Sequence, residues 1–255
     1  MEKIEIRPGY IIKGYMLKEM VGAGGFSTVY KAETIEPQPL YTSIIAIKVL
    51  HPWRLEGFQI KQFIKEGKIA NNLEHPNIVK VFDIIHKDGN FFILMEFMDT
   101  SLMKAIKTKK EMFNEKNIID IIIKTAKGIS FLHKNGIIHK DINPSNILIS
   151  NSLDKVKITD FGLAKIRKMS LFNFKRELKG GTEGYIPPEC YEGEDFDEKG
   201  DIYSFGRTVE KIYYELGFKI PENIKKLINI ATDPKPENRF EDIELIIYFL
   251  EKIRI

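Results

Sequence analysis

Apolar residues in the first hundred positions fall into short runs separated by Gly and Pro. Three of these runs are rich in β-branched and aromatic residues and predict strands, at Gly14 to Val21, Ser27 to Glu33 and Ser43 to Leu50. Helical spacing follows from about Phe58 to Leu73. Two further apolar runs, Ile78 to Ile85 and Phe91 to Met98, flank Asp88-Gly89-Asn90, which predicts a hairpin turn.

Beyond Thr100 the pattern becomes helical. Asn114 is the expected N-cap of a long helix ending near Gly136, with apolar positions at Ile118, Ile121, Ile122, Ala126, Ile129 and Leu132. Two short strand-like pieces follow at Asn146 to Ile149 and Val156 to Thr159. Later helices are predicted at Lys199 to Leu216, Pro221 to Ala231 and Glu241 to Arg254. A β-rich part therefore precedes an α-rich part, which predicts an α+β fold.

The composition is that of an ordinary folded protein, with 43% hydrophobic and 29% charged residues among 255. The single cysteine, Cys190, excludes an intrachain disulfide framework and suits a reducing compartment. No apolar stretch approaches the roughly 18 residues that span a bilayer, and the first residues lack the apolar core of a signal peptide. We therefore expect a cytoplasmic protein without membrane contact. A net charge of +3 is too small to indicate nucleic-acid binding.

Gly22-Ala23-Gly24-Gly25 lies between two predicted strands. Without a Cβ, glycine lets backbone N–H groups approach and cradle phosphates. A ligand-free glycine hairpin would look the same. A strand follows where a dinucleotide-binding turn requires a helix, and no P-loop motif is present.

Charged residues at fixed places change this picture. Lys48 ends the run Ile45-Ala46-Ile47-Lys48, and a cation within an apolar strand needs a partner unless the strand lies at an edge. Glu66 on the following helix is the candidate partner. His139-Lys140-Asp141 comes later, Asn146 stands five residues past Asp141, and Asp160-Phe161-Gly162 follows. Each triplet is common by chance, but their order and spacing together are not.

With these motifs the chain resembles the eukaryotic-type (Hanks-type) protein kinase superfamily, Ser/Thr branch, from about Tyr15 to Ile255. The resemblance is carried by a glycine-rich loop at Val21 to Val29 with Ser27 in place of its third glycine, Ala46 to Lys48, Glu66, His139 to Asn146, Asp160 to Gly162 and Pro187-Pro188-Glu189. It implies a kinase domain over residues 15–255 with a bilobal fold. The small β-rich lobe would cover about 1–97, the hinge about 96–100 and the larger helical lobe about 101–255.

The resemblance also implies the activity, which is transfer of the γ-phosphoryl of Mg·ATP to Ser or Thr of proteins, including the chain itself. Lys48 would bind the α- and β-phosphates and Glu66 would hold it in place. Asn146 and Asp160 would bind Mg²⁺, with Mn²⁺ as a substitute, and Asp141 would accept the proton of the substrate hydroxyl.

Further contacts to ATP are implied along the glycine-rich loop, the lysine strand, the hinge and one C-lobe strand, at Val21, Gly22, Ala23, Gly24, Gly25, Phe26, Ser27, Thr28, Val29, Ala46, Met95, Glu96, Met98 and Leu148. Met95 would be the gatekeeper, and backbone groups of Glu96 and Met98 would pair with adenine. The run from Ile93 to Met98 is otherwise a buried apolar strand.

The remaining family positions are structural or belong to the activation segment. The segment would include Phe161, Gly162, Ser170, Thr182, Pro188 and Glu189. His139, Asp201 and Arg239 would be structural. Asp201 would anchor the backbone of the catalytic loop, and Arg239 would pair with Glu189.

The sequence departs from the family at several positions. Asn143 replaces a Lys that normally neutralises the γ-phosphate, which leaves Lys140 or Lys165 to compensate. Lys140 itself replaces an Arg. Ala70 stands where the family usually packs a larger apolar residue against Phe161. With Gly67 nearby, this predicts a loosely seated helix around Glu66, which favours an activating partner there.

A basic stretch follows in the activation segment. It carries Lys165, Arg167, Lys168, Lys175, Arg176 and Lys179 against Glu177 alone. It indicates either a solvated loop or an acidic or phosphorylated protein substrate. Only 26 residues separate Gly206 from Asp233, which indicates a minimal C-lobe.

Two alternatives remain. The first is a nucleotide-binding scaffold of the pseudokinase kind, which would bind ATP without transfer. The intact Lys48, Asp141, Asn146 and Asp160 argue against it, while Asn143 and Ala70 favour it. The second is a small-molecule phosphotransferase of the same fold, which would lack the Gly181-Thr182 and Pro188-Glu189 features. The sequence sets no oligomeric state.

Overall fold

The computed structural model describes residues 6–24, 27–50, 57–162, 164–166 and 181–253, which belong to two compact units. Unit 1 takes Met1–Glu74 and Val79–Met98, and unit 2 takes His75–Ile78 and Asp99–Ile255. Four residues of the connection between α1 and β5 thus belong to the second unit. The boundary after Met98 lies within the predicted hinge.

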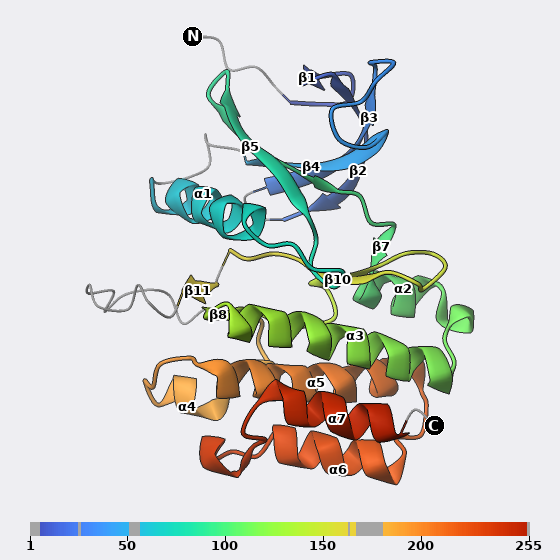
Figure 1. Ribbon diagram of the computed structural model, residues 1–255, viewed down its shortest axis with the longest axis vertical. Helices are drawn as coiled ribbons and strands as arrows, with labels where there is room; N and C mark the ends of the chain where they lie inside the picture. Colours follow the sequence, from blue (N-terminus) through green and yellow to red (C-terminus); the bar gives the residue numbers. More distant parts are fainter. Residues whose placement is uncertain (1–5, 25–26, 51–56, 163, 167–180, 254–255) are drawn as a thin grey trace. The chain divides into compact units, whose positions relative to one another are not determined.

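Unit 1 is built on a six-stranded antiparallel sheet (Figure 1). Its strands, in spatial order, are β1 (Ile11–Ile12), β2 (Tyr15–Ala23), β3 (Ser27–Thr34), β4 (Ile44–Leu50), β6 (Asn90–Glu96) and β5 (Val81–Lys87). The predicted strands are confirmed, whereas β1 was not predicted. Asp88 and Gly89 turn β5 into β6 with φ of 52° and 74°, the two positive values that a tight two-residue hairpin requires.

The main helix of unit 1, α1 (Gly57–Asn71), packs against β5. A Cβ on Gly67 would stand 2.8 Å from Cδ1 of Ile84 and 3.3 Å from Cδ1 of Ile93. Ala70 is only 2% exposed. The absence of a Cβ at position 67 therefore lets α1 pack close to β5 and β6.

Unit 2 is mainly helical (Figure 1). Its helices are α2 (Leu102–Thr108), α3 (Glu115–Lys134), α4 (Pro188–Tyr191), α5 (Glu198–Leu216), α6 (Glu222–Ala231) and α7 (Ile243–Ile253), with short 3-10 turns at Lys110–Met112 and Pro236–Asn238. Short strands pair as β10 (Val156–Ile158), β9 (Ile147–Ile149) and β7 (Thr100–Ser101), and as β11 (Lys165–Ile166) with β8 (Ile137–Ile138). The α+β class is confirmed. Among the helices of the described ranges, none has both the length and the apolar character for crossing a membrane.

The central helices of unit 2 begin and end at residues suited to those places. Asn114 accepts a hydrogen bond from the backbone of Asn117, whose side chain bonds back to the N–H of Asn114, so α3 starts with a reciprocal cap. The Asp197 side chain caps α5 by accepting the backbone N–H groups of Lys199 and Gly200, and Gly217 ends the helix with φ of 75°. These caps define the residues at which α3 begins and at which α5 begins and ends.

A buried ion pair joins α4 to the residues before α7. The guanidinium of Arg239 grips the carboxylate of Glu189 through two hydrogen bonds of 2.7 Å, and the Arg239 side chain is 0% exposed. Carbonyl oxygens of Lys199, Asp233 and Pro234 accept its remaining N–H groups at 2.8–3.2 Å. Arginine satisfies all of these acceptors because its five donors lie in one planar fork, which lysine lacks.

We predict that Arg239→Leu lowers the free energy of unfolding of unit 2 by about 3–5 kcal/mol, because Glu189 keeps a buried charge without its partner. The double variant Arg239→Leu/Glu189→Leu should lose less than the sum of the two single losses. Urea unfolding monitored by far-UV circular dichroism measures the free energy of unfolding of the single and double variants. Strictly additive losses would show that the pair is not coupled.

Candidate functional site

The loop after β8 is held by a fully buried carboxylate on α5. Asp201 accepts hydrogen bonds from the backbone N–H groups of His139 and Lys140, both at 2.9 Å, and lies 2.9 Å from Nε2 of His133. Its exposure is 0%. A buried carboxylate is costly unless it is hydrogen-bonded, so these donors fix the loop to the start of α5.

His139 links the same loop to the strand end at Thr159. Its Nε2 lies 3.0 Å from the carbonyl oxygen of Thr159, while Nδ1 accepts the N–H of Asp141 at 3.2 Å. Because Nδ1 accepts a hydrogen bond, the proton of a neutral imidazole is on Nε2. The His139 ring also lies 5.3 Å from the ring of buried Phe161. The loop, β10 and the Asp160-Phe161-Gly162 triplet are thereby packed together.

The carboxylate of Asp141 is engaged through both oxygens. Oδ1 accepts the Nδ2 of Asn143 at 3.0 Å and the backbone N–H and hydroxyl of Thr182 at 2.9 and 2.7 Å. Oδ2 accepts only the Nδ2 of Asn146, at 2.7 Å, among the residues that the structure describes. These hydrogen bonds fix the orientation of the Asp141 side chain, and Oδ2 can still accept a hydrogen bond from another donor.

The side-chain amide oxygen of Asn146 is a candidate metal ligand. Its Nδ2 donates to the carbonyl and carboxylate oxygens of Asp141, which settles the orientation of the amide. Within the described ranges, Oδ1 of Asn146 accepts no hydrogen bond. Asp160 holds a φ of 67°, which is uncommon for a residue other than glycine and is frequent at functional sites. A carboxylate and an amide oxygen are ligands that suit a hard cation such as Mg²⁺.

In unit 1 the structure pairs Lys48 on β4 with Glu66 on α1. Nζ of Lys48 is 2.6 Å from Oε1 of Glu66, and the two side chains are 12% and 10% exposed. Nζ also stands 5.9 Å from the centre of the Phe63 ring. Buried ion pairs add little to stability compared with apolar residues of the same size. The stability of the fold therefore gives little reason for a lysine and a glutamate at these two positions.

The glycine-rich turn joins β2 to β3. Gly22 pairs with Val29 and Ala23 with Thr28, and the N–H of Gly24 donates to the carbonyl of Ser27 at 2.8 Å. A Cβ on Gly22 or Gly24 would meet its nearest atom only at 3.8 Å, and neither residue has a positive φ. The fold therefore does not require glycine at these two positions.

Of the other residues predicted to contact ATP, Met95 and Glu96 lie on β6, Ala46 on β4 and Leu148 on β9, while Met98 follows β6. Met95 and Met98 are both 8% exposed, and Ala46 is buried on β4. The N–H of Glu96 already donates to the carbonyl of Lys80 at 2.8 Å, so it is not a free donor for a base. Gly25, Phe26 and Ser170 lie outside the described residues, as does the basic stretch from Arg167 to Lys179.

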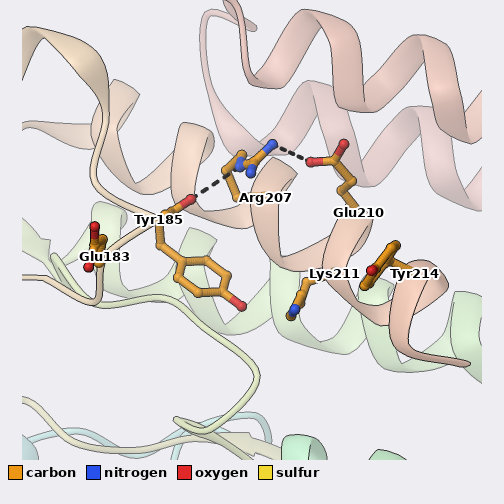
Figure 2. Close-up of a pocket in the computed structure, with 7 residues that line it drawn as sticks. Glu183, Tyr185, Arg207, Glu210, Lys211 and Tyr214 are labelled. Atoms are coloured by element: carbon orange, nitrogen blue, oxygen red, sulfur yellow. Dashed lines mark hydrogen bonds and ion pairs between the residues drawn. The ribbon is translucent and has the colours of Figure 1, made fainter.

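A cavity of about 330 Å³ that the sequence did not indicate borders the segment after Thr182. Figure 2 shows the half-buried ring of Tyr185 lying beside it, with its hydroxyl directed toward Lys211 and Tyr214 of α5. Arg207 forms the opposite wall, donating to the carbonyl of Gly184 at 3.1 Å and pairing with Glu210. Burial raises the pKa of Tyr185 to about 12, so its phenol stays protonated at neutral pH.

Cys190 on α4 is not a reactive thiol. Burial, followed by the charge of Glu189, raises the pKa of the thiol to about 11. The thiolate is the nucleophilic form, and it is scarce at neutral pH. Cys190 therefore acts as a packing residue.

Comparison with known proteins identifies the family. Residues 15–240 match the family model described as protein kinase domain. The chain is 31% identical to a probable serine/threonine-protein kinase of Clostridium acetobutylicum over 94% of its length, and 30% identical to the serine/threonine-protein kinase PrkC of Bacillus subtilis over 85%. It is also 30% identical to the serine/threonine-protein kinase CTR1 of Arabidopsis thaliana over 74%.

The chain covers 40%, 32% and 23% of those three relatives. The range matched by the family model, residues 15–240, includes the catalytic loop, the Lys48–Glu66 pair and the glycine-rich turn described above. The motifs, the two-unit architecture and the matching model lead to the same result: this chain belongs to the protein kinase domain family.

Proposed function

We propose that this domain transfers the γ-phosphoryl group of Mg·ATP to serine or threonine hydroxyls of proteins, its own chain among them. The observation that carries the proposal is the state of Asp141. Its Oδ1 already accepts a hydrogen bond from a threonine hydroxyl at 2.7 Å. Its Oδ2 accepts one from Asn146 and can accept another from a second hydroxyl. A carboxylate held in this way can orient an acceptor hydroxyl and take its proton.

Asn146 and Asp160 are the residues that would hold the metal ion. The amide oxygen of Asn146 and the carboxylate of Asp160 are ligand types that fit Mg²⁺, and Mn²⁺ would bind the same ligand set. Mg²⁺ supplies neutralisation of the charge on the phosphates. The chain itself contributes the direction of the Asn146 oxygen, since Asp141 occupies both donors of that amide.

Lys48 and Glu66 are proposed to bind the α- and β-phosphates as a unit. Glu66 fixes the ammonium at 2.6 Å and so reduces the loss of side-chain freedom when a phosphate binds. Gly22 and Gly24 support binding of the same phosphates, because no steric constraint within the fold requires glycine at either position. Close approach of phosphates to that backbone explains the residue choice.

The finer assignments stay proposals. Acidic or phosphorylated proteins are the proposed substrates, on the strength of the basic stretch between Lys165 and Lys179. An activating partner at α1 and a cytoplasmic location are proposed from the sequence alone. The domain boundary at 15–255 is proposed likewise.

We predict that Asp141→Asn lowers kcat for phosphate transfer by about 10²–10⁴-fold, because the amide cannot accept the hydroxyl proton. ATP binding should persist. Incorporation of labelled phosphate into a generic protein and into the chain itself, with mass spectrometry of the modified residue, measures this. Asp154→Asn is the matched control, since Asp154 is an exposed carboxylate whose partners within the described ranges are Ser150, Ser152 and the backbone of residues 154 and 155.

Equal incorporation by wild type and Asp141→Asn would show that Asp141 is misassigned. Binding of ATP by the wild type without any transfer would favour the pseudokinase scaffold. Phosphate found on a small molecule but on no protein would favour the small-molecule phosphotransferase.

Lys48→Met should abolish most transfer, by about 10²-fold or more, because one charge that neutralises the phosphates is lost. The double variant Lys48→Met/Glu66→Met should recover the melting temperature, since an apolar pair replaces a buried ion pair without penalty. It should not recover transfer. Lys31→Met on neighbouring β3 is the control. Recovery of both properties would make the pair purely structural.

A further inference from the structure

Asn143 lies in the catalytic loop at the position where the family carries a lysine, and the structure shows it to be buried. It is 3% exposed. Its Nδ2 is 3.1 Å from the carbonyl oxygen of Asp141, 3.0 Å from Oδ1 of the same residue and 3.1 Å from Oγ1 of Thr182. Its Oδ1 accepts the N–H of Ser145 at 2.9 Å. Both ends of the amide are therefore occupied.

These partners define what Asn143 can do. Carbonyl and carboxylate oxygens only accept hydrogen bonds, so the amide nitrogen must face Asp141 and the oxygen must face Ser145. The Thr182 hydroxyl donates to Asp141 at 2.7 Å and accepts from Asn143, which closes a ring of three side chains. Asn143 is the buried member of this ring, while Asp141 is half-buried and Thr182 is exposed. The polar atoms of the buried amide are all hydrogen-bonded, which favours a single orientation of its side chain.

We infer that Asn143 is a positioning residue, which fixes the carboxylate of Asp141 against Thr182 through neutral hydrogen bonds. This inference rests on the proposed function. Asn143 does not replace the missing lysine charge, because its donors point at Asp141 and Thr182. It instead joins the catalytic loop to the segment after residue 181, so the direction of the base depends on both.

The test compares steady-state kinetics of phosphate transfer by wild type, Asn143→Ala and Asn143→Asp. A base displaced by about 1 Å costs on the order of 100-fold, so kcat of Asn143→Ala should fall by about that factor. The KM for ATP should stay unchanged, since Asn143 contacts none of the residues assigned to ATP. Asn143→Asp keeps the shape but sets an acceptor against acceptors, and should lose at least as much.

A double-mutant cycle separates positioning from a general loss of structure. Asn143 and Thr182 act on the same oxygen, so Asn143→Ala/Thr182→Val should lose little more than the worse single variant. Asn151→Ala is the matched control, because the Asn151 side chain accepts a hydrogen bond from the exposed Lys109 amine at 2.9 Å and has no other partner among the described parts of the chain. It should keep the kcat of the wild type.

Several results would overturn the inference. They are an unchanged kcat in Asn143→Ala, an effect confined to the KM for ATP, or losses that multiply in the double variant. If the wild type transfers no phosphate, the proposed function fails separately, and a crystal structure of Asn143→Ala decides the inference. An Asp141 carboxylate left in its wild-type direction would then refute it.

Discussion

The buried carboxylate of Asp201 is the constraint on which the candidate site depends. A charge with no solvent contact must be satisfied by donors, and here two of them are backbone N–H groups of residues 139 and 140. Lys140 takes a left-handed φ of 70° at this point, a conformation that costs free energy and is held by those bonds. The loop is therefore set in place by α5 before any ligand binds, and preorganised groups need no rearrangement during reaction.

Polar contacts of directed geometry also hold other parts of the two units. Asp141 is tied to Thr182, and Glu189 a few residues later is tied to Arg239, so the segment that follows residue 181 is anchored at both ends by polar contacts. In unit 1 the Lys48–Glu66 pair is likewise buried and close. Each of these contacts is better explained by the need to hold a direction than by stability, because apolar residues would pack as well.

Sequence reasoning was most successful where the cause is local. The cap at Asn114, the turn at Asp88-Gly89 and the end of α5 at Leu216 follow from local sequence alone, and all are confirmed. It was least successful where partners are distant in the chain. The sequence indicates that Asn143 lacks a charge, but not that Thr182, 39 positions later, accepts its amide. Likewise, the sequence does not show that Gly67 lets α1 pack against Ile84, which lies on a strand later in the chain. The cavity beside Tyr185 arises in the same way, from residues on two separate elements.

A crystal structure with Mg²⁺ and a non-hydrolysable ATP analogue tests the account most directly. We expect the ion to be bound by Oδ1 of Asn146 and the carboxylate of Asp160 at about 2.0–2.1 Å, with Asp141 and Asn146 where they lie without ligand. A nucleotide bound elsewhere, or an Asn146 amide that has to turn over to reach the metal, would contradict the claim that the loop is preorganised.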